Sequence, residues 1–98
     1  MLAVRSVLNE QLTHIKDNLI KLGSLTETAV FDAMNALDRQ DISLAQRVVR
    51  GDEEINQLCL DLKQQCLNVL ATQHPKASDL RLVLATINMV TDLERIGD

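Results

Sequence analysis

The sequence has few aromatic residues, glycines or prolines. Its 98 residues include one phenylalanine, no tryptophan or tyrosine, three glycines and one proline. Because β-strands favour aromatic side chains and single-stranded nucleic acids stack on them, this composition argues against an all-β fold and against binding of that kind. A chain of this length has room for one hydrophobic core.

Charge and hydropathy exclude further classes of protein. Ten basic and fourteen acidic residues give a net charge of -4, and no basic stripe is present to bind the phosphates of DNA or an anionic membrane. No segment approaches the roughly 18 consecutive apolar residues of a membrane span, and the N-terminus lacks the pattern of a signal peptide. We therefore expect a soluble cytoplasmic protein that binds no nucleic acid directly.

The two cysteines, Cys59 and Cys66, are seven residues apart in one predicted helix. This spacing places them on the same face and about 10 Å apart along the helix axis, too far for a disulfide between them. The chain also lacks a Cys-x-x-Cys pair. We predict two reduced thiols in the hydrophobic core.

Two polar segments, residues 38–41 and 73–79, divide the chain into three parts. Within each part, apolar residues recur every three or four positions, which predicts helices over about 4–38, 41–72 and 78–98. Gly23 lies inside the first helix and is expected to leave it continuous. Because short connections make consecutive helices antiparallel, we predict an all-α fold: one domain of residues 1–98 forming an up-down-up three-helix bundle.

The third predicted helix is apolar over most of its circumference. Its polar residues Arg81, Asn88, Asp92 and Arg95 gather on one narrow face. Such a helix is buried on more than one side, so we expect it to pack against a second subunit or a missing domain as well as its own bundle. The proposed oligomer interface consists of Leu82, Met89, Leu93 and Ile96.

Four carboxylates are expected at a similar height in the bundle. Asp52 lies about twenty residues before the second loop, and Glu94 and Asp98 lie about the same distance after it, while counting across the first loop brings Glu27 to the same level. Glu94 and Asp98 share one face, where their like charges repel. Oxygen ligands in this arrangement favour a hard cation such as iron, manganese, magnesium or calcium.

A second interpretation of the same carboxylates requires no metal. They could be neutralised by a basic residue, such as Arg50 or Arg95 of a second copy, or be solvated at the end of the bundle. Asp61 and Lys63 are expected on the solvated side of the second helix. The residue pattern alone does not decide between a metal site and carboxylates that are neutralised or solvated.

Three segments resemble the PhoU family of phosphate-uptake regulators. Residues 75–81 read PKASDLR, residues 92–98 read DLERIGD, and residues 49–56 read VRGDEEIN. The resemblance covers essentially the whole chain and implies one three-helix repeat of a protein that has two. The second repeat is then absent, and the third helix stops inside its own motif, so we expect a truncated chain.

The resemblance also implies multinuclear iron or zinc held by E/D-x-x-x-D motifs. Glu94 and Asp98 match one motif. Asp52 matches the first position of its partner motif, where Asn56 stands in place of the expected second carboxylate and is a possible additional ligand through its carbonyl oxygen. Glu27 belongs to no motif of the family and remains a candidate ligand only by its height.

By resemblance, the chain is a non-enzymatic regulator of phosphate uptake and phosphate-starvation signalling that contacts the ATPase of the phosphate ABC transporter and a sensor histidine kinase. No nucleophile with a neighbouring base and no glycine-rich phosphate loop is visible. Two alternatives are kept: a histidine phosphotransfer domain using His14, and a metal-binding or structural oligomerisation bundle. A homo-oligomer, such as a homodimer, is expected because the apolar surface of the third predicted helix exceeds what one bundle can cover.

Overall fold

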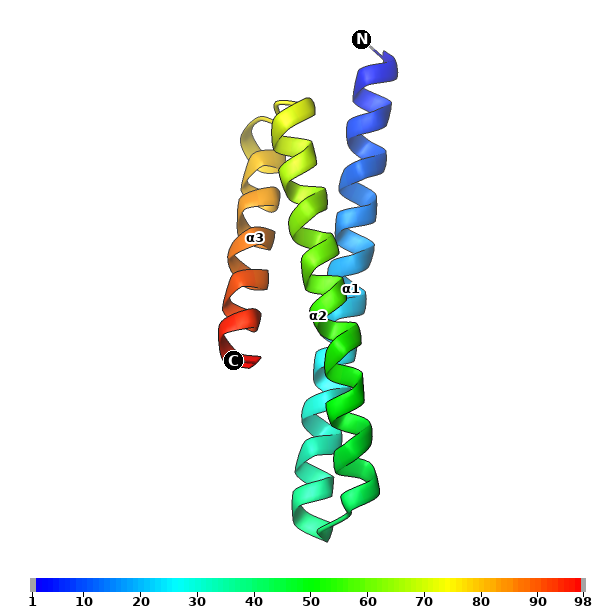
Figure 1. Ribbon diagram of the computed structural model, residues 1–98. Helices are drawn as coiled ribbons and strands as arrows, with labels where there is room; N and C mark the ends of the chain where they lie inside the picture. The colour runs from blue at the N-terminus through cyan, green and yellow to red at the C-terminus, as the bar shows by residue number, and fades with distance from the viewer. Residues whose placement is uncertain (1, 98) are drawn as a thin grey trace.

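The computed structural model describes residues 2–97, which form three helices joined by two short turns. They are α1 (Leu2–Arg39), α2 (Ile42–Thr72) and α3 (Ala77–Gly97), arranged up, down and up (Figure 1). The predicted all-α fold is confirmed. Helix α1 runs through Gly23 without a break, as the apolar spacing on either side of it indicated.

The turn between α1 and α2 is fixed by backbone geometry and one side chain. Gln40 adopts a positive φ of 54°, and the amide of Asp41 then donates to the carbonyl of Ala36 at 2.9 Å, which is the bond that closes a Schellman C-cap. Asp41 also begins the next helix, because its Oδ1 accepts from the amide of Leu44 at 3.0 Å. One short segment therefore ends α1 and caps α2.

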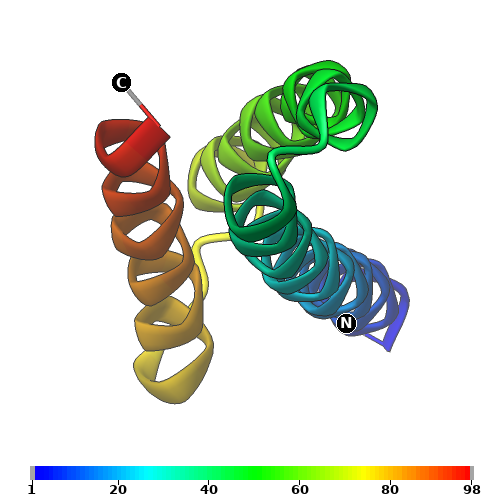
Figure 2. The same cartoon turned by 90° about the horizontal axis from the view of Figure 1, so that it is seen from below.

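Helix α3 packs almost wholly against α2. Figure 2 shows it beside α2 and away from α1. The core lies where α2 is flanked by both of the other helices, and Thr86 is buried within α3 with its hydroxyl donating to the carbonyl of Leu82 at 2.8 Å. The buried hydrophobic residues of this cluster are Leu8, Leu12, Ile15, Leu22, Leu58, Cys59, Leu62, Cys66, Val69, Val83 and Val90.

The other half of the α1–α2 hairpin has almost no buried side chains. Between residues 23 and 57, only Ala36 is buried. Helix α3 does not reach this half (Figure 1), so the two helices there have only each other to pack against. The longest dimension of the molecule is 57 Å and its radius of gyration is 16.3 Å, against about 13 Å for a compact domain of this length.

Candidate functional site

The carboxylate of Glu94 lies between α3 and α2 and is bound by a lysine. Its Oε1 is 3.0 Å from Nζ of Lys63, and its Oε2 accepts a hydrogen bond from the same nitrogen at 3.2 Å. Both side chains are partly sheltered, with 31% of Lys63 and 38% of Glu94 exposed. The expectation that Lys63 belongs to the solvated face of its helix is therefore wrong, because the lysine reaches across to α3.

The thiol of Cys59 lies close to this ion pair. Burial is the main reason that the pKa of Cys59 is raised, and the negative charges of Glu94 and Asp52 raise it further, while Lys63 lowers it. Burial alone raises the pKa of Cys66. Both cysteines are free and buried, which confirms the prediction of two core thiols.

Asp52 and Asn56, predicted as metal ligands on α2, are exposed and bonded to each other. The side-chain amide of Asn56 donates to Oδ2 of Asp52 at 3.3 Å. The negative charges of Asp52 and Glu94 both raise the pKa of Cys59, but Asp52 bonds to Asn56 on its own helix and Glu94 binds Lys63. Glu27 is exposed on α1, and Asp98 lies outside the described residues.

The described residues by themselves do not assemble the ligands of a multinuclear iron or zinc cluster. Within residues 2–97, no three side chains of His, Cys, Asp or Glu converge to hold a metal ion. The strongest candidate ligand, Glu94, already has both oxygens on an ammonium group. The contribution of Asp98 stays a prediction.

The residues predicted to form an oligomer interface divide between two environments on α3. Leu82 and Leu93 are half-buried against the core, so they partly stabilise the bundle itself. Met89 is 44% exposed and is available to a partner. The side chain of Ile96 lies outside the described residues. Leu84, 46% exposed, adds to the free apolar surface of this helix.

His14, considered as a phosphotransfer residue, is exposed on α1. It lines a small polar depression between α1 and α2 together with Gln11, Gln65 and Asn68. Oε1 of Gln11 is buried there without a hydrogen-bond partner. No group near His14 distinguishes it as a phosphoryl acceptor, and its role stays untested.

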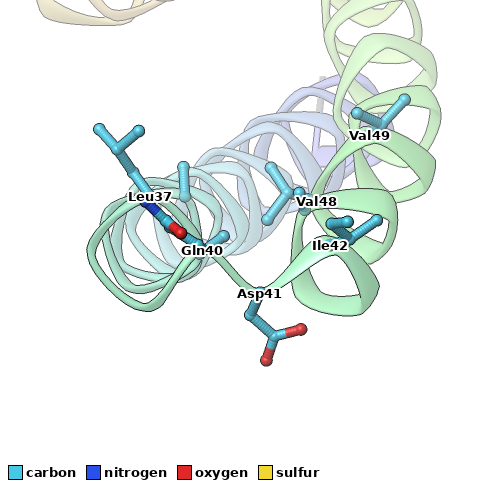
Figure 3. A pocket seen from close by; sticks show the side chains of 9 residues that line it. Leu37, Gln40, Asp41, Ile42, Val48 and Val49 are labelled. Atoms are coloured by element: carbon cyan, nitrogen blue, oxygen red, sulfur yellow. The ribbon is translucent and has the colours of Figure 1, made fainter.

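An apolar groove of about 600 Å³, which was not predicted from the sequence, lies at the α1–α2 turn. Figure 3 shows Leu37 of α1 and Gln40 of the turn on one side of it, and Ile42, Val48 and Val49 of α2 on the other. Leu37 is 82% exposed and Ile42 is 74% exposed. The signal was present in the sequence, because apolar residues flank the polar turn where a solvated loop end would carry charges.

None of the helices in residues 2–97 has the length and apolar character needed to cross a lipid bilayer.

Comparison with known proteins gives a consistent result over nearly the whole chain. A family model described as the PhoU domain matches residues 19–98. The phosphate-specific transport system accessory protein PhoU of Edwardsiella tarda is 41% identical over 90 residues, covering 92% of this chain and 37% of that protein. The homolog from Pseudomonas putida is 43% identical, covering 92% and 35%. The Escherichia coli K12 protein is 37% identical, covering 92% and 37%.

The chain thus spans little more than a third of the length of these relatives. No solved structure has significant similarity to it. The family-model match extends over most of the chain and includes the α3 segment that contains Glu94 and Arg95. By its matched residues and its three-helix architecture, the chain belongs to the PhoU family.

Proposed function

We propose that this chain is a non-enzymatic regulator of phosphate uptake. The observation that supports the proposal best is its identity of about 40% to phosphate-specific transport system accessory proteins over some 90 residues. A regulator of this kind acts by contact, and a helical hairpin presenting apolar side chains is suited to contact.

In this proposal, the protein works in the cytoplasm as an adaptor between two partners: the ATPase of the phosphate ABC transporter and a sensor histidine kinase. Contact with the first would restrain transport. Contact with the second would dampen transcription of phosphate-starvation genes when phosphate is plentiful. The relatives are named as accessory proteins of a phosphate-specific transport system, which supports the link to the transporter, and the link to the kinase extends this proposal.

Self-association is the second part of the proposal. Met89 and Leu84 expose apolar surface on α3, at 44% and 46%, and their helix touches little besides α2. We propose that a second copy of the chain packs on this surface and shields it from water.

The function is tested in the native host. Deleting the gene should raise phosphate uptake and switch on a phosphate-starvation reporter in medium rich in phosphate, and supplying the gene again should reverse both effects. Pull-down of the transporter ATPase and the kinase with the purified chain measures the contacts directly. A deletion strain with normal uptake and a silent reporter would contradict the proposal.

A further inference from the structure

The ion pair between Lys63 and Glu94 joins α2 to α3. Both carboxylate oxygens of Glu94 lie within 3.2 Å of one ammonium nitrogen. Among the side chains that the structure describes, no other ion pair is formed, although the chain carries ten basic and fourteen acidic residues. The Lys63–Glu94 pair therefore differs from the other charged side chains in joining two helices at a partly sheltered position.

Two side chains of α2, Lys63 and Cys59, lie near Glu94. They are four residues apart, which places them on the same face of the helix. Cys59 is 2% exposed, and burial favours its neutral thiol. This part of α2 therefore offers Glu94 one positive charge and one neutral sulfur.

A metal ion at Glu94 would have to compete with Lys63 for the same two oxygens. It would also lie beside the displaced ammonium group, and like charges at such short distances repel. Asp52 does not offset this disadvantage, because it is exposed and bonded to Asn56 on its own helix.

We infer that Lys63 takes the place of a metal ion in this domain: its ammonium group neutralises Glu94 across the α2–α3 contact, and α3 is held on α2 without iron or zinc at this position. The carboxylate motif that the family resemblance associates with metal then has a structural role in this chain. Its counter-ion is built into the sequence.

Metal content tests the inference directly. The 98-residue chain, purified without an affinity tag and dialysed against zinc sulfate or ferrous sulfate and then against buffer, should retain far less than one metal ion per chain. Its thermal unfolding midpoint should be the same with and without EDTA. Stoichiometric iron or zinc that is lost in Glu94→Gln would overturn the inference.

The replacement of metal by lysine is tested by Lys63→Asp, which puts a carboxylate opposite Glu94. This variant should unfold at a lower temperature than wild type, and zinc sulfate should raise its midpoint by a clearly larger amount than it raises that of wild type. Lys21→Asp is the matched control, because Lys21 is exposed on α1 and its replacement changes the net charge equally. Equal zinc responses in wild type and Lys63→Asp would count against the inference.

A double-mutant cycle with Lys63→Gln and Glu94→Gln keeps the test independent of whether Lys63→Asp folds. We expect the two residues to be coupled by about two- to fivefold in the equilibrium constant of unfolding, as for partly exposed ion pairs. The coupling should shrink in 1 M sodium chloride because salt screens the pair. A coupling of zero at low salt would refute the role given to Lys63.

Discussion

Replacing Leu62 by alanine should destabilise the bundle much more than the same replacement at an exposed leucine of α2. Leu62 is 0% exposed and belongs to the core cluster on α2, the helix that both of the others pack against. Removing a fully buried leucine side chain costs about 2–5 kcal/mol, from lost transfer free energy and the cavity left behind. The entire free energy of unfolding of a domain this size is about 5–15 kcal/mol.

The expected fall in the thermal midpoint is about 10–25 °C, measured by circular dichroism at 222 nm. Leu60→Ala is the matched control: it makes the same chemical change two residues away, at a position that is 49% exposed, and should cost less than about 1 kcal/mol. Urea titrations should give the same ranking with unchanged m-values. Equal losses in the two variants would refute the assignment of the core face of α2.

Four further outcomes follow from the burial and exposure of particular residues. Gly23→Ala should raise the free energy of unfolding by about 1 kcal/mol, because the added methyl group meets no atom within 4 Å apart from its chain neighbours and the adjacent backbone of its own helix, and alanine favours a helix; a loss of stability would show a hidden clash. The thiols of Cys59 and Cys66, whose pKa values are raised in the folded state, should react with Ellman's reagent far more slowly than in urea. The stability that these raised pKa values contribute is present below the unfolded thiol pKa of about 8.5 and is lost as pH rises toward the folded pKa. The free energy of unfolding measured from pH 7 to 10 should therefore decline, and this decline should be absent from a variant with both cysteines replaced by alanine. In sedimentation velocity, Met89→Asp should weaken self-association more than Asn88→Asp, and equal effects would reject the proposed contact on α3.

Most of the fold could be predicted from the spacing of the apolar residues and from the two polar segments that separate the helices. Apolar residues spaced every three or four positions are enough to define long helices, and Asp41 carried a capping signal that the structure bears out. What periodicity could not give was the position of α3 around the hairpin. A helix that is apolar on most sides fits several positions equally well, and tertiary contacts decide that it lies on α2 with little contact to α1.

The candidate site was harder to predict, because the position of a residue along the helix axis does not determine which group its side chain binds. Counting residues put Glu94 and Asp52 on neighbouring levels, and both do influence Cys59. The partner of Glu94 was missed because a lysine next to acidic and polar residues reads as solvated. A lysine has a long flexible stem that can lie along a helix and deliver its charge to a neighbouring one.

The uneven burial along the α1–α2 hairpin implies uneven motion. Amide hydrogens near Leu62 and Val69 should exchange only through opening of the whole bundle, whereas those from Ala33 to Val48 can exchange through fraying of the turn end alone. A ligand or protein that settled on the frayed end would have to order it first, so its binding would be weakened by that entropy loss and strengthened by any substitution that stiffens the turn.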